Sequence, residues 1–254
     1  ICFRRRLHRP TAFEIFKKNG KSYLIDIPNV ENSQMKKFFL PFMSTGTLSE
    51  FTEKWLNYEI STFEYLLKLN DFSSRTFNDL SAYPVMPWVI SDYNSERIDL
   101  DDPKIYRDLS KPMGALNQER LNVLKENSTD SREVIPTHLY QNGYLSPLIV
   151  LSYLVRVEPF TSIHVNYHGG KFEHNSKIFK SIPLAFKNAT TLKSDFMELI
   201  PEFFTSHEFL LNRENFDLTG CEYTIDNSSS IDSLTSVDQI SLENNSEQSQ
   251  SKAK

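Results

Sequence analysis

Three histidines close together in the sequence are the residues best suited to chemistry, because histidine pairs are common zinc ligands. His164 and His168 are four residues apart, a spacing that places two rings on one face of a helix, and His174 follows. The stretch SIHVNYHGG alternates in polarity and ends in Gly-Gly, so it predicts a strand followed by a turn. No glutamate stands beside His164 as in the HExxH motif. We therefore expect structural histidines and no metal site.

Two other stretches fall short of known binding loops. Asp92, Asn94 and Glu96 match the first three ligand positions of a calcium loop, but Pro103 stands where the loop needs its final glutamate. The glycines of residues 168–171, HGGK, lack the flanking residues of a phosphate-binding loop. The sequence therefore predicts no catalytic residue, no cofactor site and no enzyme activity.

The N-terminal part of the chain is basic. Residues 1–46 contain nine lysines and arginines against three acids, whereas the whole chain carries a net charge of −5. Arg4, Arg5, Arg6, Lys17 and Lys18 are candidate contacts with a partner or with an anionic membrane, where each contributes about 1 kcal/mol. The alternative is that alternate strand residues simply point into solvent. The middle of the chain is acidic, which argues against nucleic acid as a partner.

Composition limits the class of protein further. The 254 residues can hold one large domain, and the 19 phenylalanines and 11 tyrosines provide material for a core. Two distant cysteines predict no disulfide framework and fit a reducing compartment. The longest apolar stretch, residues 147–157, is too short to span a bilayer. Because the chain does not begin with Met and opens on ICFRRRLHRP, which resembles a strand in progress, we expect a piece of a longer protein.

The elements that would position these residues begin with a strand meander. Residues 2–27 predict three short strands, with Asn19-Gly20 as a hairpin turn. A short helix is expected around Met35 to Phe42, and residues 44–49 form a plausible linker. The apolar spacing over residues 50–69 approximates one face of a long helix.

The run LSAYPVMPWVISDY, residues 80–93, can be neither a regular helix nor a central strand. Pro84 and Pro87 each lack a backbone N–H and push the preceding residue toward extended conformations. Val85, Met86 and Trp88 nevertheless favour burial. We therefore predict an extended, irregular segment that passes through the core, with its backbone paired by side chains or neighbouring loops.

The second half of the chain predicts several short helices. Asn117 and the pairs Asp102-Pro103 and Ser146-Pro147 are helix starts, since proline is tolerated in a first turn. The remaining expectations are a helix from Asp102 through Leu109, a helix over residues 174–188 kinked or ended at Pro183, a helix over residues 195–200 capped by Ser194, an extended PEFF at 201–204, and a disordered tail over residues 226–254.

Several motifs together resemble the BEACH domain. The resemblance runs from Phe51 to Leu218 in family order, through WLNYEISTFEYLLKLN, RTFNDLSAYPVMPWVISDY, DLSKPMGALN, SYLVRVEPFTSIH, GGKF, ELIPEFF and EFLLNRENFDL. Irregular extended core segments are a family feature, and residues 80–93 look like one. The signature residues carried by these motifs are Trp55, Glu59, Phe63, Asn78, Asp79, Pro84, Pro87, Trp88, Pro112, Arg156, Glu158, Pro159, Pro201 and Glu202.

The resemblance implies an α+β chain with defined parts. Residues 1–43 would be the closing strands and helix of a PH-like domain, residues 44–49 a linker, and residues 50–225 a mainly helical BEACH domain lacking roughly its last third. The PH-like part would pack against the BEACH part, with a groove for protein partners between them. The implied function is a non-enzymatic cytoplasmic scaffold of the trafficking machinery, in vesicle, lysosome-related or autophagic events at endomembranes. The alternative is peripheral lipid binding through the basic segment.

Overall fold

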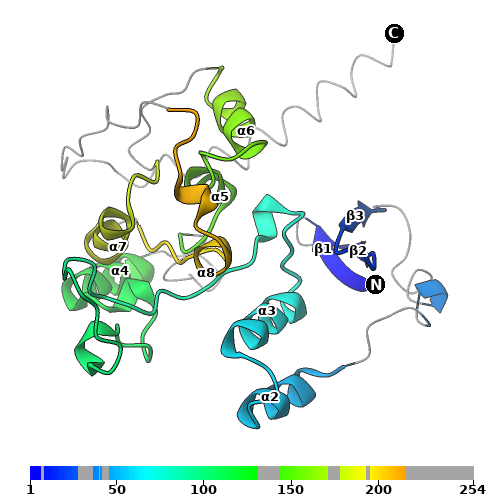
Figure 1. Ribbon diagram of the computed structural model, residues 1–254, viewed down its shortest axis with the longest axis horizontal. Coiled ribbons are helices and arrows are strands. Elements are labelled where there is room, and N and C mark those ends of the chain that lie inside the picture. Colours follow the sequence, from blue (N-terminus) through cyan, green and yellow to red (C-terminus); the bar gives the residue numbers. More distant parts are fainter. Residues whose placement is uncertain are drawn as a thin grey trace. The chain divides into compact units, whose positions relative to one another are not determined.

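The computed structural model describes residues 1–6, 9–27, 37–39, 41, 46–130, 143–170, 178–192 and 195–215, with backbone only at 127–130. A small antiparallel sheet comes first, and short helices follow it (Figure 1). The expected α+β class is therefore confirmed. Within the described ranges, no helix is both long and apolar enough to cross a bilayer.

The sheet has the predicted meander topology, with strand order β1-β2-β3 and antiparallel pairing throughout. Phe16 pairs with Ser22 at the end of the second hairpin, and Gly20 in the turn has a φ of +83°. Glycine adopts this left-handed conformation without steric cost, which explains why Asn-Gly makes the turn. The strands are β1 (Cys2–Arg6), β2 (Arg9–Phe16) and β3 (Ser22–Asp26).

Residues 37–39 are helical and touch the sheet. The Phe39 ring lies 4.6 Å from the ring of buried Phe13 on β2. The rest of the helix expected around Met35 to Phe42 lies outside the described residues.

The single helix expected over residues 50–69 is wrong, because two helices occupy this region. They are α2 (Leu48–Leu56) and α3 (Thr62–Phe72). Thr47 and Ser61 each form a capping box with the glutamate three residues later, so each begins a new helix. Tyr58, between them, has a left-handed φ of 57°, which ends the first helix.

Residues 80–93 form the predicted irregular segment. After the 3₁₀ turn η2 (Leu80–Ala82), Met86 exchanges two backbone hydrogen bonds of 2.8 Å with Leu199. The Trp88 side chain is 0 % exposed, and its indole donates to the Met197 carbonyl at 2.7 Å. The Trp88 backbone N–H donates to the Glu198 carboxylate at 3.0 Å. Pairing with side chains and a distant loop thus replaces regular secondary structure, as expected.

Two predicted helix starts are confirmed in the second half. Ser146 caps a helix with proline in its first turn, and Asn117 accepts a hydrogen bond from the Arg120 N–H. Asp102 also caps, but only the 3₁₀ turn η3, so the predicted extension through Leu109 is wrong. The elements are η3 (Pro103–Ile105), η4 (Met113–Ala115), α4 (Gln118–Asp130), α5 (Pro147–Tyr153), α6 (Phe160–Tyr167), α7 (Ile182–Thr191), α8 (Glu202–Thr205) and η5 (Glu208–Leu210).

Four predictions about this half are corrected. The stretch around His164 is helix α6 and not a strand. Pro183 lies in the first turn of α7, which begins at Ile182, and does not kink the helix, because Ser181 caps it and proline fits a first turn. Residues 195–200 are extended, since Leu199 pairs with the Met86 segment, whereas PEFF forms α8. Ser194 itself lies outside the described residues.

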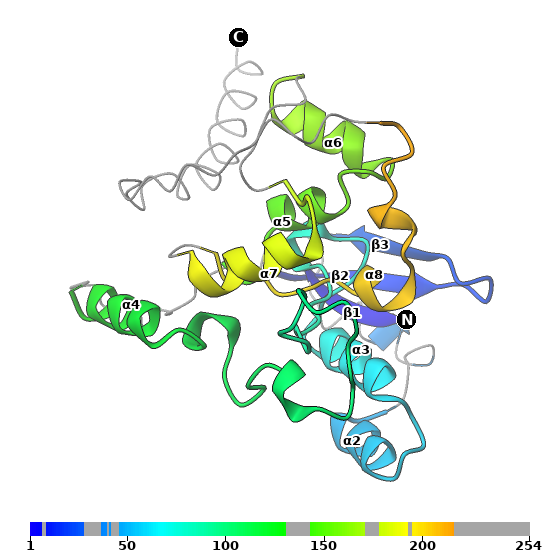
Figure 2. The ribbon, with the colours of Figure 1, turned by 60° about the vertical axis from the view of Figure 1, so that its left-hand side comes forward.

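An aromatic core joins these helices. Figures 1 and 2 both show α5 close to α8, and the buried cluster draws on α5, α7 and the irregular segment. Trp88 lies 5.3 Å from Phe186, and Tyr153 lies 5.0 Å from Phe203, measured between ring centres. We call this cluster the aromatic core. Its fully buried members include Met86, Trp88, Val150, Tyr153 and Ile200.

Candidate interaction site

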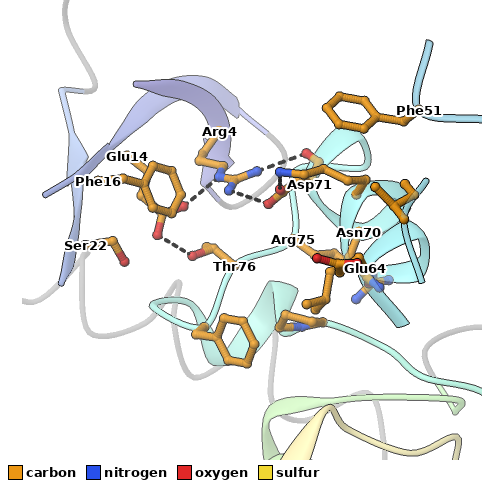
Figure 3. A pocket seen from close by; sticks show the side chains of 15 residues that line it. Arg4, Glu14, Phe16, Ser22, Phe51, Glu64, Asn70, Asp71, Arg75 and Thr76 are labelled. Atoms are coloured by element: carbon orange, nitrogen blue, oxygen red, sulfur yellow. Dashed lines mark hydrogen bonds and ion pairs between the residues drawn. The ribbon is translucent and has the colours of Figure 1, made fainter. Parts of the chain in front are cut away.

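A cavity of about 280 Å³ lies where the sheet meets helices α2 and α3 (Figure 3). Strand residues Arg4, Glu14 and Phe16 line it on one side, and helix residues such as Phe51 and Asp71 line it on the other. We call it the junction cavity. It brings together residues more than 50 positions apart in the sequence.

Arg4 links the sheet to α3 and is only 3 % exposed. Its Nε donates to Glu14 at 2.8 Å, its Nη2 to the Asp71 carboxylate at 3.0 Å, and its Nη1 to the Asp71 carbonyl at 2.9 Å. Burial lowers the pKa of Arg4, but the hydrogen bonds to Asp71 and Glu14 outweigh burial and raise it. Arg4 is therefore an internal ion-pair residue, and its expected contact with a membrane or partner is wrong.

Glu14 is a second buried residue of this contact and accepts hydrogen bonds from three different side chains. Besides Arg4, it accepts hydrogen bonds from Thr76 Oγ1 at 2.8 Å and Asn78 Nδ2 at 2.7 Å. Burial raises the pKa of Glu14, but the hydrogen bonds from Thr76 and Arg4 outweigh burial and lower it. A carboxylate held in this way is a poor general base, because its charged form is already stabilised by fixed donors.

The other basic candidates divide into two groups. Arg6 donates to both oxygens of the buried Asp79 carboxylate, at 2.9 and 3.0 Å, and is therefore a second link from the sheet. Arg5, Lys17 and Lys18 are exposed. Lys17 places its ammonium 5.6 Å from the centre of the Tyr23 ring at the hairpin end. These three are the exposed candidates, whereas Arg6 keeps 37 % of its side chain exposed and Arg4 is buried.

Exposed aromatic rings form the walls of the junction cavity. Phe16 is 49 % and Phe77 51 % exposed. Phe51 lies between two lysines, with Lys54 at 5.6 Å and Lys68 at 5.3 Å from its ring centre. The cavity volume of about 280 Å³ is slightly below the range of about 300–1,000 Å³ typical of small-molecule pockets. The cavity is suited to one or two apolar side chains of a partner.

His164 and His168 have no third potential metal ligand beside them in the described part of the chain. The rings of His164 and His168 lie 4.3 Å apart on α6, and burial together with His168 lowers the pKa of His164 to about 4. Among the described residues, no three potential ligands gather around a common point. His174 lies outside the described residues.

Comparison with known proteins places these features in a family. The family model of the Beige/BEACH domain matches residues 53–234, more than half of the chain. The chain belongs to the BEACH domain family. BEACH domain-containing protein B of Arabidopsis thaliana is 44 % identical over 167 residues, which make up 65 % of this chain but 6 % of that protein. BEACH domain proteins are generally non-enzymatic scaffolds.

The signature residues of this BEACH chain lie in different settings. Pro84, Trp88 and Pro201 are buried, and Glu202 accepts a hydrogen bond from the Tyr83 hydroxyl at 2.6 Å. Burial raises the pKa of Glu202. Asn78 and Asp79 bind the sheet, through Glu14 and Arg6 respectively. We call this contact between the sheet and residues 71–79 the junction. The remaining signature residues lie along α2 and α3 and in the loops and turns that join the elements. They are Trp55, Glu59, Phe63, Pro87, Pro112, Arg156, Glu158 and Pro159.

The sequence analysis missed the acidic half of the junction. Glu14, Asp71 and Thr76 are not among the candidate residues of the sequence, although Glu14 and Asp71 hold Arg4 in place and Thr76 donates to Glu14. One local signal was available for Glu14, which interrupts the apolar strand AFEIF with a charge. No local signal connects Glu14 to Thr76, which lies 62 residues away.

Proposed function

We propose that this BEACH chain is a protein-interaction module that acts as a non-enzymatic scaffold in membrane traffic. Its setting is the cytoplasmic face of endomembranes, in vesicle, lysosome-related or autophagic events, and its partners are other proteins of that machinery. The observation that carries the proposal is the junction cavity. Its buried charges are satisfied internally by Arg4, Glu14 and Asp71, while its aromatic walls stay exposed. A surface of that kind favours binding over catalysis.

We further propose that the sheet is the closing part of a PH-like domain packed against the BEACH domain. The support is its three-stranded meander with helical residues 37–39 next in sequence, and its two arginine links to the region after α2. The family match begins at residue 53, after the sheet. The junction cavity would then be a groove between two domains.

A photo-crosslinking residue tests the scaffold proposal. Benzoyl-phenylalanine replaces Phe77 in the cavity wall of the full chain, and, as a matched control, the similarly exposed Leu109 outside the cavity. We expect discrete protein adducts from position 77 that are absent from position 109 and are lost when Phe16→Ser is added. Equal adducts from both positions would contradict the proposal.

A second candidate function is peripheral lipid binding through the hairpin between β2 and β3. The observation that favours it is the combination of exposed Lys17 and Lys18 with Tyr23, which is 50 % exposed. Lysines next to an interfacial aromatic ring suit an anionic membrane.

Vesicle flotation with phosphatidylserine tests lipid binding. At about 1 kcal/mol for each cation, Lys17→Glu with Lys18→Glu lowers vesicle affinity by roughly 25-fold or more, and added salt weakens binding of the unmodified chain. Lys104→Glu, far from the hairpin in sequence, is the control. Unchanged flotation of the hairpin variant would exclude this function.

A further inference from the structure

The helix side of the junction cavity carries positive charge that a partner can reach. Figure 3 shows Phe51 on this side, opposite Phe16 on the strand side. The ammonium groups of Lys54 and Lys68 lie 5.6 and 5.3 Å from the centre of the Phe51 ring. The Lys68 side chain is 41 % exposed, and Lys54 is exposed as well. Two solvent-facing cations therefore stand beside an aromatic wall of the cavity.

These two lysines have little counter-charge in the described part of the chain. No ion pair there involves Lys54. Lys68 pairs with Asp71 at 3.3 Å, but the same carboxylate also accepts a hydrogen bond from Arg4 at 3.0 Å. One partly exposed acid is thus shared between two cations, and an incoming acid would still find positive charge to neutralise.

The other charged residues of the cavity lining do not offset this excess. Glu14 is buried and accepts hydrogen bonds from three side chains. Glu64 accepts from the N–H and the hydroxyl of Ser61 at the start of α3, both at 2.9 Å. Arg75 donates to a backbone carbonyl and a tyrosine hydroxyl, and no ion pair within the described ranges involves it. The lining therefore offers cations to a partner, whereas its acids are already engaged.

The apolar part of the cavity is suited to an aromatic side chain. Phe16 and Phe77 line it with about half of each residue exposed, at 49 and 51 %. A partner ring packed on these two rings would remove apolar surface from water and add ring-to-ring contacts. The volume of about 280 Å³ has room for one such side chain.

We propose that the junction cavity binds a segment of a partner protein in which an aromatic residue is flanked by acidic residues. This inference rests on the proposed function and names the chemistry of the partner. The aromatic side chain packs on Phe16 and Phe77, and the flanking carboxylates meet Lys54 and Lys68 at the rim. Charge complementarity of this kind selects among apolar partners and speeds their encounter with the site.

Biotinylated photoreactive peptides test the proposal on the full, unmodified chain. The acidic probe is Ser-Glu-X-Glu-Ser, where X is benzoyl-phenylalanine and serves as the aromatic residue. Two matched probes replace both glutamates by glutamine or by lysine. Because exposed ion pairs are individually weak, we expect roughly fivefold more adduct from the acidic probe than from the glutamine probe. Mass spectrometry should map the adducts to cavity residues such as Leu67 and Phe77.

Charge reversal at the rim separates the effect of charge from that of cavity shape. Lys54→Glu with Lys68→Glu should lower the adduct yield of the acidic probe by roughly tenfold and make the lysine probe the better ligand. Lys54→Gln with Lys68→Gln introduces no repulsion and should equalise the acidic and glutamine probes. Lys104→Glu with Lys187→Glu, at exposed positions outside the cavity lining, is the matched control and should leave the order of the probes unchanged.

The possible outcomes distinguish this inference from the proposed function. Equal adducts from the acidic and glutamine probes, adducts outside the cavity, or no adducts from any probe would overturn the acidic partner. A preference for the acidic probe that survives charge reversal would overturn it as well. In each case, protein adducts from benzoyl-phenylalanine at position 77 would still support the proposed function, and only their absence would remove both.

Discussion

The aromatic core and the sheet junction of this BEACH chain are held together by different forces. Around Trp88, rings and aliphatic side chains pack with almost no exposure, and backbone groups are paired across the irregular segment. At the junction, Arg4 and Arg6 join the sheet to acids that lie more than 60 residues later. The core therefore depends on apolar burial, and the junction depends on charge pairing.

The same contrast is visible in the carboxyl groups of the two regions. Burial raises the pKa of Glu198 and Glu202 in the core. At the junction, donors from Thr76 and Arg4 outweigh burial and lower the pKa of Glu14. Charge pairing allows the sheet to dock without covering the walls of the junction cavity, and this leaves Phe16 and Phe77 accessible to a partner.

The largest expected effect comes from opening the aromatic core. Trp88→Ala removes a fully buried ring that contacts Tyr93 and Phe186, and it lowers the free energy of unfolding by about 3–5 kcal/mol. Urea unfolding followed by circular dichroism measures the change. The control is Trp55→Ala on the partly exposed α2, which costs much less. Equal losses for the two tryptophans would remove the distinction between core and surface rings.

The second-largest effect on stability is expected at the junction between the sheet and α3. Glu14→Gln leaves buried Arg4 with only the Asp71 carboxylate, and lost hydrogen bonds to a charged group lower stability by about 2 kcal/mol. Hydrogen exchange measured by mass spectrometry should rise in β1 and β2 and stay unchanged around Trp88. Glu59→Gln, at an exposed position, is the control. Faster exchange in both regions would mean that the core and the junction form one cooperative unit.

A fall in pH should change the stability of the junction and of the aromatic core in opposite directions. Glu14 has a lowered pKa, so its stabilisation is present above the ordinary value near 4.5 and is lost as pH falls through its folded-state pKa. Glu198 and Glu202 have raised pKa values, so the folded core binds protons more readily and gains stability as pH falls from neutrality toward 4.5.

Urea unfolding between pH 7 and pH 3.5 checks both signs. In a Trp55→Phe background, Trp88 fluorescence reports on the core, and hydrogen exchange of β1 and β2 reports on the junction. Glu202→Gln is expected to flatten the pH dependence of the core and leave that of the junction in place. A core that loses stability from pH 7 to pH 5 would contradict the raised pKa values.

The smallest expected effect is at the rim of the junction cavity. Lys68 and Asp71 form a partly exposed pair at 3.3 Å, and solvent screens such pairs. Lys68→Gln therefore costs only about 0.5 kcal/mol, and thermal unfolding at low and high salt should show the difference shrink as salt rises. A loss as large as that of Glu14→Gln would mean that the rim, and not the buried network, holds the sheet.

The sequence by itself determined the features that depend on neighbouring residues. The Asn19-Gly20 hairpin, the start of α5 at Ser146 and the irregular path after Pro84 all follow from local backbone chemistry. The BEACH resemblance followed from motifs in order along the chain. The break between α2 and α3 was also readable from the Ser61 and Glu64 capping box, although the apolar spacing obscured it.

Tertiary structure alone decided which charges became structural and which stayed accessible. Arg4, Arg5 and Arg6 are identical side chains in consecutive positions. Arg4 and Arg6 nevertheless form ion pairs with acids that are distant in the sequence, whereas Arg5 is exposed to solvent. The same holds for residues 195–200, which are extended because Leu199 pairs with Met86, 113 positions earlier. Local sequence specifies turns and caps through bonds a few residues long. Pairing across such separations is fixed only when burial brings the partners together.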